Sequence, residues 1–426
     1  MFGLDSKKTI NFERDKRKFS ESFNFNPQIG TEYKLTKQGE RPGIPYLLDP
    51  NQDGVMEGTD GCTQKLFKPL HTGKLDMHSG IAPIYASIYQ GENNRTIVNN
   101  SSPLRSMERT VEGSYIDKDA KTIILPRSVK SIGEKTFFEF KNLENIIIRD
   151  GVKKIDDYAF AGCSNLREFI MPNSVEIIGW SAFSGCSKFS KINIPNKVTK
   201  ILPHAFENCS NLTEINILNT VNAIGWATFS GCSNLREINL ANSVTRIDSH
   251  AFAHCLSLTN ISIPNGVTKI DSHTFSGCSS LREVAIPDNV TEIGDCAFED
   301  CSSLTEIVIP NNVTKIGSFA FSRCSNLKKI DISSSVREIG HSAFSQCSNL
   351  AEIKIPNGVT KIDSFTFSDC SNLSKVRIPR SVIEIDDYAF ENCSNLSKVA
   401  IPNSTKYSSE AFDEDCLIMI KMYKSL

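Results

Sequence analysis

The chain lacks the features that mark several specialised classes of protein. Its formal net charge is −2 over 426 residues, which offers no general attraction to nucleic acid or acidic lipid. The longest apolar run near the C-terminus, 417–420, is far shorter than the roughly 20 residues of a membrane span. The first 20 residues contain no apolar segment typical of a secretory signal. We therefore expect no nucleic-acid partner and no membrane span, and a location that is cytoplasmic or reached by non-standard export.

Recognisable catalytic chemistry is also missing. The sequence contains no convincing nucleophile and base set, no phosphate-binding loop and no paired catalytic carboxylates, and its seven histidines are scattered. These absences predict a protein that is not an enzyme and that needs no cofactor, apart from the calcium loop described below. An effector activity in the N-terminal region stays open as an alternative.

Cysteine, in contrast, is abundant and periodic. Twelve of the 14 cysteines recur at a fixed step of 23 residues, from Cys163 to Cys416, and almost all have a phenylalanine three positions earlier. Free cysteine behaves as a small buried hydrophobe, and equivalent residues of stacked repeats point the same way, which is poor geometry for a disulfide. The pattern predicts a column of buried, reduced thiols.

The 23-residue unit is too small to bury its apolar side chains alone, so the units must stack around a shared core. The alternation of Leu281, Val284 and Ile286 predicts a strand, and proline at the strand end, as at Pro287, starts the return path. We expect an α/β-type repeat solenoid with a parallel sheet on one face, and short strands and 3₁₀ or short helical turns on the return. The expected organisation is a non-repeat region at 1–113, about 13 turns at 117–416 and a closing strand at 417–426.

The block IPNGVTKIDSHTFSGCSSLREVAIP and its relatives, over about 70% of the chain, resemble the BspA-like, Treponema-type subclass of leucine-rich repeats. The resemblance implies a right-handed solenoid used for recognition, with relatives that look like surface adhesins. It favours a non-enzymatic, adhesin-like protein whose partner is another protein, such as a host surface or matrix protein. An intracellular scaffold is the alternative, as is an effector whose repeats target an active N-terminal region.

The outward positions of the strands are the best candidates for binding, because the inward positions form the core. Charge along them is acidic in the middle of the array and basic toward its C-terminal end, while Arg236 and Arg282 stand beside glutamates and are candidates to neutralise part of the stripe. A solvated sheet face kept soluble by charge is the alternative interpretation. The candidates are Glu214, Glu237, Glu283, Glu306, Glu352, Lys354, Lys375, Arg377 and Lys398.

Trp180 and Trp226 share one repeat position two turns apart, with Pro203 between them. If this position is exposed, the three residues form an apolar patch of the kind that interfaces favour. Local packing over the turn explains them equally well.

Two sets of residues have the spacing of metal ligands. Asp49, Asn51, Asp53 and Asp60 fit a calcium loop, with Gly54 at its sharp turn, although a polar turn without metal is the alternative. His250, His273 and Cys296 occupy one position in three successive turns, as zinc ligands could. Neighbouring positions show no matching fourth ligand, and the step between turns is expected to be too wide, so we interpret these three as surface variation.

Overall fold

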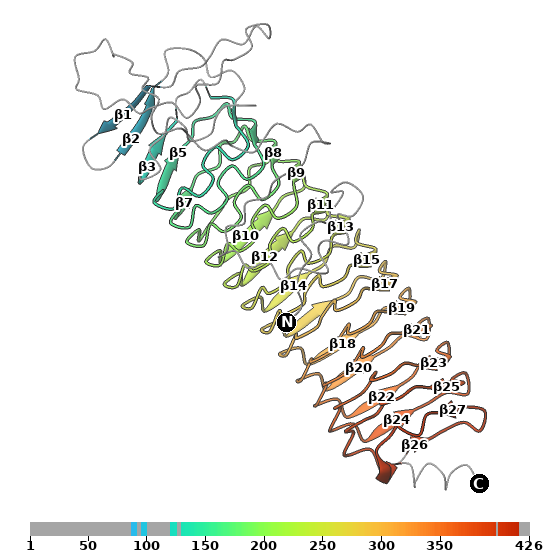
Figure 1. Ribbon diagram of the computed structural model, residues 1–426. Coiled ribbons are helices and arrows are strands. Elements are labelled where there is room, and N and C mark those ends of the chain that lie inside the picture. Colours follow the sequence, from blue (N-terminus) through green and yellow to red (C-terminus); the bar gives the residue numbers. More distant parts are fainter. Residues whose placement is uncertain (1–86, 92–94, 100–119, 126–128, 398, 417–426) are drawn as a thin grey trace, which may run out of the picture. The chain divides into compact units, whose positions relative to one another are not determined.

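The computed structural model describes residues 87–91, 95–99, 120–125, 129–397 and 399–416. From residue 120 onward the chain winds into a parallel β-solenoid of about 12 turns of about 23 residues, with little helix. Two rows of parallel strands run along the repeat array (Figure 1). The predicted solenoid is therefore confirmed.

The first row, called here the long-strand sheet, contributes one strand of two to four residues from almost every turn. Strands of successive turns lie side by side along this row, and they pair in parallel within several short ladders, so that Glu237 lies beside Glu214. Single bridges at Lys191 fill the place between β7 and β10. The strands are β3 (Thr122–Ile124), β5 (Asn145–Ile147), β7 (Glu168–Phe169), β10 (Glu214–Ile217), β12 (Glu237–Leu240), β14 (Asn260–Ser262), β16 (Glu283–Ala285), β18 (Glu306–Val308), β20 (Lys329–Asp331), β22 (Glu352–Lys354), β24 (Lys375–Arg377) and β26 (Val399–Ala400).

The second row, the short-strand sheet, has two residues from each turn, the first facing outward and the second, except at β27, buried in the core. Isoleucine occupies the inward position of every strand before β27, because a branched apolar side chain packs well on a pleated surface. The strands are β4 (Ser131–Ile132), β6 (Lys154–Ile155), β8 (Ile177–Ile178), β9 (Lys200–Ile201), β11 (Ala223–Ile224), β13 (Arg246–Ile247), β15 (Lys269–Ile270), β17 (Glu292–Ile293), β19 (Lys315–Ile316), β21 (Glu338–Ile339), β23 (Lys361–Ile362), β25 (Glu384–Ile385) and β27 (Lys406–Tyr407).

The core between the two sheets contains a continuous column of phenylalanine rings. From Phe137 to Phe412 each ring stacks on the equivalent ring of the next turn, with centroids 4.9–5.7 Å apart. Stacking at this distance follows from the spacing of roughly 4.8 Å between paired strands. Each turn is therefore bound to its neighbours by aromatic contact as well as by backbone hydrogen bonds.

The cysteine column lies beside the phenylalanine column, and the predicted buried, free thiols are confirmed. Each thiol from Cys163 to Cys393 donates a hydrogen bond of 3.0–3.2 Å to the carbonyl of a phenylalanine 26 residues earlier. Burial raises the pKa of these thiols, to about 12 at Cys278. They are packing groups, because a buried protonated thiol is a poor nucleophile.

Consecutive hydrogen-bonded turns form the return path, where the sequence predicts 3₁₀ or short helical turns. In one repeat the backbone hydrogen bonds follow the 3₁₀-type pattern: Ala253 N–H donates to the His250 carbonyl and Cys255 N–H to the Phe252 carbonyl, at 3.0 and 3.2 Å. The backbone is left-handed at His250 and His254, with φ of 60° and 58°, and equivalent residues repeat this along the array. These residues interrupt the helical path, since αL positions do not propagate a right-handed helix.

The ends of the array differ from its middle. Strands β1 (Ser87–Gly91) and β2 (Arg95–Asn99) form an antiparallel hairpin, and β2 pairs in parallel with β3. These strands fall in the region expected to be non-repeat, the rest of which lies outside the described residues, as does the expected closing strand at 417–426. The described residues include no helix with the length and apolar character needed to cross a membrane.

Candidate binding face

The outward residues of the long-strand sheet are displayed in two straight rows. In strands such as β16 and β22 the first and third residues are exposed and the second is buried, because side chains alternate along a strand. Residues of equal position then stack from turn to turn. All of the sequence candidates except one are exposed on this face: Glu214, Glu237, Glu283, Glu306, Glu352, Lys354, Lys375 and Arg377. Lys398 lies outside the described residues.

The acidic members of this face differ in how their charge is balanced. Glu214 pairs with Lys191 at 3.2 Å, and Glu352 lies 4.0 Å from Lys375. Among the described residues, no cationic nitrogen lies within 4.0 Å of the carboxylates of Glu237, Glu283 or Glu306. Neither Arg236 nor Arg282 makes the neutralising pair considered from the sequence. The middle of the face therefore has three exposed carboxylates without a described ion pair, called here the central acids.

The second outward row adds polar and apolar contacts beside the central acids. The amide of Asn239 donates to the amide oxygen of Asn216 at 2.7 Å, which forms a short amide ladder. Val308, two residues beyond Glu306, is 63% exposed, and Ala285 is exposed at the same position one turn earlier. Sequence reasoning did not select Val308, although an apolar residue at an outward strand position is the signal that identifies it.

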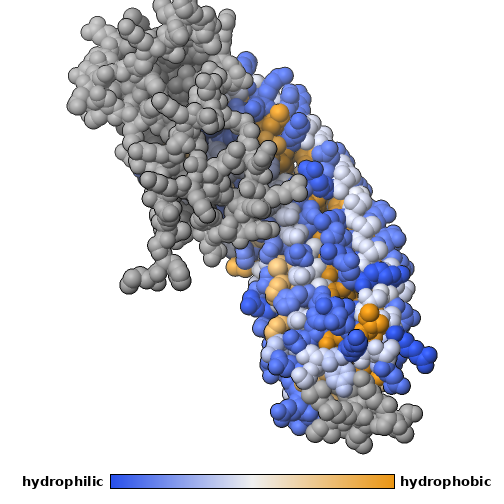
Figure 2. Space-filling view, turned by 45° about the vertical axis from the view of Figure 1, so that its right-hand side comes forward, coloured by the Kyte–Doolittle hydropathy of each residue, from blue (hydrophilic) through white to orange (hydrophobic). Residues whose placement is uncertain are grey.

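From β15 to β25, the outward charges on the short-strand sheet are balanced within the sheet. Lysine and glutamate alternate along consecutive turns and pair across them: Lys269 with Glu292 at 3.3 Å, Lys315 with Glu338 at 3.5 Å and Lys361 with Glu384 at 4.0 Å. In the view of Figure 2, hydrophilic side chains cover most of the visible repeat surface, and hydrophobic ones form small separate patches. This sheet leaves little net charge for a partner to recognise.

The tryptophans lie on the return path, where they interleave with histidines. Trp180, Pro203 and Trp226 are all half-buried. The ring of His204 lies between the two indoles, with centroids 5.5 Å from Trp180 and 4.4 Å from Trp226. His204 also approaches Glu207, with Nδ1 2.9 Å from Oε2. The two tryptophans are therefore part of a mixed ring ladder, in which His204 takes the place between them. Sequence reasoning missed His204, which stands one position after Pro203.

The ring ladder continues through the histidines that were considered as zinc ligands. Trp226 Nε1 donates to His250 Nδ1 at 3.2 Å, and the rings of His250 and His273 stack with centroids 4.4 Å apart. Burial and, to a lesser extent, the neighbouring imidazoles lower the pKa of His250 to about 4. His250 is therefore neutral at neutral pH, with the Nδ1 lone pair occupied by the indole.

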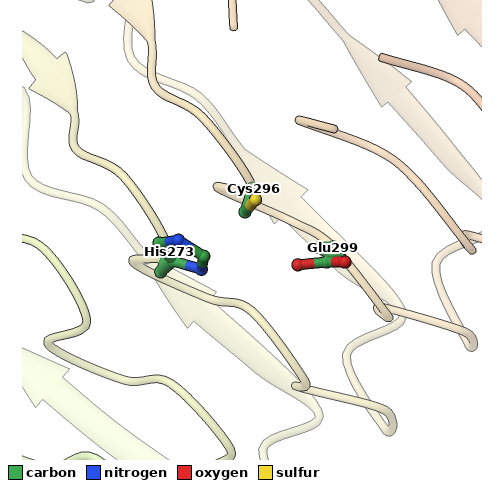
Figure 3. Close-up of side chains that lie close together, drawn as sticks. All are labelled: His273, Cys296 and Glu299. Atoms are coloured by element: carbon green, nitrogen blue, oxygen red, sulfur yellow. The ribbon is translucent and has the colours of Figure 1, made fainter. Parts of the chain in front are cut away.

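His273 and Cys296 do come together, and they do so with a residue that the sequence did not suggest. Donor atoms of His273, Cys296 and Glu299 all lie within 4.8 Å of one another, and all three residues are half-buried. Figure 3 shows His273 on one turn and Cys296 and Glu299 on the next. The step between turns is therefore narrower here than expected, because donor atoms of His273 and Cys296 lie within 4.8 Å across adjacent turns. Glu299, three residues after Cys296, adds a donor from the same turn as Cys296.

The calcium-loop residues Asp49, Asn51, Asp53 and Asp60 lie outside the described residues, so that hypothesis stays a prediction.

Solved structures with a similar fold include two leucine-rich-repeat proteins. A leucine-rich repeat protein from Bacteroides ovatus is 26% identical, with 77% of this chain and 98% of that chain covered and a TM-score of 0.58. A leucine rich cell surface protein from Faecalibacterium prausnitzii is 27% identical, with 80% and 98% covered and a TM-score of 0.50. No curated protein matches the chain.

Leucine-rich-repeat proteins generally bind other proteins, and their solenoids are typically binding scaffolds without enzymatic activity. The model of the BspA type leucine rich repeat region matches residues 108–235, 203–328 and 314–426, three overlapping segments that together run from residue 108 to residue 426. The repeat length, the two parallel sheets and this match agree that the chain belongs to the BspA-type leucine-rich-repeat family.

Proposed function

We propose that this protein recognises another protein through the long-strand sheet, without catalysis, and that the central acids Glu237, Glu283 and Glu306 receive basic groups of the partner. The observation that carries the proposal is the difference in charge balance between the two sheets. Charges from β15 to β25 of the short-strand sheet pair with one another, whereas the central acids are exposed and form no described ion pair within 4.0 Å. Lys329, the neighbour of Glu306 in the next turn, pairs instead with Asp331 at 2.8 Å. Unbalanced charge on an ordered surface steers a complementary partner and fixes its register.

The same face supplies the other contacts that an interface needs. Val308 and Ala285 add apolar area next to Glu306 and Glu283, and the Asn216–Asn239 ladder adds hydrogen-bonding groups. Interfaces combine an apolar centre with polar groups that set orientation. A partner segment with basic residues spaced to meet successive turns, and small apolar residues between them, fits this arrangement.

Binding is tested with two triple variants that have the same change in charge. Glu237→Gln, Glu283→Gln and Glu306→Gln neutralise the central acids, and Glu292→Gln, Glu338→Gln and Glu384→Gln are the matched control on the short-strand sheet. Each protein is immobilised, and proteins captured from cell extracts or host matrix are quantified by mass spectrometry. We expect one or more proteins to be retained by the wild type and the control, and at least about tenfold less by the central-acid variant, which corresponds to about 1.4 kcal/mol. Equal retention by all three proteins would falsify the choice of face.

We further propose that this recognition takes place at the cell surface, where an adhesin-like protein meets a protein of another cell or of the surrounding matrix. Support comes from the Faecalibacterium prausnitzii relative, which is described as a cell surface protein and is 27% identical over 80% of this chain. An intracellular scaffold that uses the same face is the alternative. Antibody labelling of intact source cells, compared with permeabilised cells, separates the two: labelling only after permeabilisation contradicts the surface location.

A further inference from the structure

The cluster of His273, Cys296 and Glu299 is separate from the long-strand sheet and is not used by the proposed function. Imidazole nitrogen, thiolate sulfur and carboxylate oxygen are the three donor types that zinc binds in proteins. Donors around one tetrahedral zinc ion lie roughly 3.5 Å apart, given bond lengths of about 2.0–2.3 Å. The three donors already lie within 4.8 Å of one another, so rotations about side-chain bonds need to close only about 1 Å.

Backbone hydrogen bonds hold the turns that carry these donors. The N–H of His273 donates to the carbonyl of Asp295 at 2.9 Å, and the N–H of Cys296 donates to the carbonyl of Ser318 at 2.8 Å. The first bond ties the turn of His273 to the turn that carries Cys296, and the second ties that turn to the one after it. Glu299 follows Cys296 by three residues, across a turn closed by the hydrogen bond from its own N–H to the Cys296 carbonyl at 3.2 Å. The scaffold is therefore ordered before any ion binds, and half-burial leaves the donors accessible from solvent.

We propose that His273, Cys296 and Glu299 bind a borderline divalent cation of the zinc type, which links two adjacent turns of the solenoid. Binding replaces the proton of the Cys296 thiol by the metal and releases that proton to solvent, so that the sulfur coordinates as thiolate. The three protein ligands leave one tetrahedral position, which water fills. His250 is not among the residues whose donor atoms lie together in this cluster.

Glu299 has two competing contacts that metal binding can replace. Its hydrogen bond with the Cys296 thiol is lost when the thiol proton leaves. Arg323 Nη1 lies 3.9 Å from Glu299 Oε1 but only 3.3 Å from Asp300 Oδ2, so the guanidinium keeps a partner when Glu299 turns toward the metal. In a solenoid, stability depends on coupling between neighbouring repeats. A metal held by two turns adds to that coupling, and the stabilisation grows with metal concentration as RT ln(1 + [M]/Kd).

Cobalt(II) is the spectroscopic probe, used on the full chain after removal of any affinity tag. Cobalt bound to a thiolate has a sulfur-to-metal charge-transfer band in the near ultraviolet. We expect this band to saturate at one equivalent in the wild type, to vanish in Cys296→Ser, and to need at least tenfold more cobalt in His273→Ala and Glu299→Gln. Cys62→Ser and His341→Ala are the matched cysteine and histidine controls and keep the band. No band in the wild type, or an unchanged band in Cys296→Ser, overturns the proposal.

If the ligand variants fail to fold, the proposal is tested by X-ray absorption on protein that keeps His273, Cys296 and Glu299. Cys62→Ser protein is loaded with one equivalent of zinc and studied by X-ray absorption at the zinc edge. We expect one sulfur neighbour at about 2.3 Å and nitrogen or oxygen neighbours at about 2.0–2.2 Å. A spectrum with no sulfur neighbour overturns the assignment of Cys296 as ligand. Neither experiment involves the long-strand sheet, so failure here leaves the proposed recognition function untouched.

Discussion

The long-strand and short-strand sheets are alike on the inside and different on the outside. Both present apolar side chains to the same core: Ile307 and Ile316, which belong to one turn, are 3% and 0% exposed. On the outside, the short-strand sheet pairs its charges across turns, whereas the long-strand sheet leaves Glu237, Glu283 and Glu306 without a described ion pair. Inward positions are constrained by packing in both sheets, and only outward positions are free to vary with what the surface binds.

The difference between the sheets also shows that stacking places the outward side chains of equivalent positions in a row along the solenoid. Equivalent residues of adjacent turns lie roughly 4.8 Å apart, so like charges at one position form a stripe and alternating charges form a ladder of ion pairs. Glu214 beside Glu237 illustrates the first arrangement, and Lys269 beside Glu292 the second. A single substitution in a 23-residue unit thus changes the character of a surface.

The largest expected effect tests the similarity of the two inward rows. Ile307→Ala in β18 and Ile316→Ala in β19 each remove buried methyl groups from the shared core, and each should lower the free energy of unfolding by about 2–5 kcal/mol. The measurement is urea unfolding followed by circular dichroism, with Thr305→Ala, an exposed residue of the same turn, as the control. If either isoleucine variant unfolds at the wild-type urea concentration, the sheets do not share one core as described.

Much of the fold could be predicted from the sequence because it depends on one repeated pattern. The fixed step of 23 residues places Cys278 and Phe275 in the core, and the structure buries both completely. The sequence also shows that the last turn departs from the repeat, because Phe412 stands one residue before the position that the 23-residue step predicts. Its ring nevertheless stacks on that of Phe390, with centroids 4.9 Å apart. The left-handed residues of the return path, such as His250, were not visible, because αL conformation at a residue other than glycine arises from the stacking of whole turns.

The candidate sites were less predictable, because they depend on departures from the repeat. Which strand residues face outward follows from alternation, so the positions of Glu237 and Glu283 could be predicted, but the absence of an ion pair with the adjacent arginines could not. Glu299 was missed although it replaces the serine or alanine that stands at this position in most other turns. Searching for such replacements near a cysteine or histidine would have found it.

A smaller effect is expected from the two glutamine triples used to test binding, and its sign should differ between the sheets. Glu292→Gln, Glu338→Gln and Glu384→Gln remove ion pairs worth a few tenths of a kcal/mol each, so the triple should lower the free energy of unfolding by about 1 kcal/mol. Glu237→Gln, Glu283→Gln and Glu306→Gln remove carboxylates without a described ion pair, and Glu237 repels Glu214, so this triple should leave stability unchanged or raise it by a few tenths.

Urea unfolding at low ionic strength measures both triples, and repetition in 1 M salt is the control, because screening should reduce both effects. Equal destabilisation by the two triples would contradict the comparison, since it would mean that the central acids have favourable partners.

The smallest expected effect concerns one lysine of the short-strand sheet and its dependence on pH. Lys361 lies 2.8 Å from Asp386, 3.5 Å from Asp363 and 4.0 Å from Glu384, and the hydrogen bond to Asp386 is the main reason why the pKa of Lys361 is raised. A raised pKa in the folded state stabilises the protein fully below the unfolded pKa of about 10.4, and this contribution is lost as pH rises through the folded value.

Lys361→Gln should therefore lower the free energy of unfolding by about 0.5 kcal/mol at pH 8, and the difference from wild type should shrink above about pH 10.4. Lys354→Gln on the long-strand sheet is the matched control, because no described carboxylate forms an ion pair with Lys354, and it should differ little from wild type at either pH. Urea unfolding at pH 8 and pH 11 measures the free energy of unfolding of both variants and of the wild type. A difference for Lys361→Gln that persists unchanged at pH 11 would show that its side chain stabilises the sheet by packing, since charge pairing requires the protonated amine.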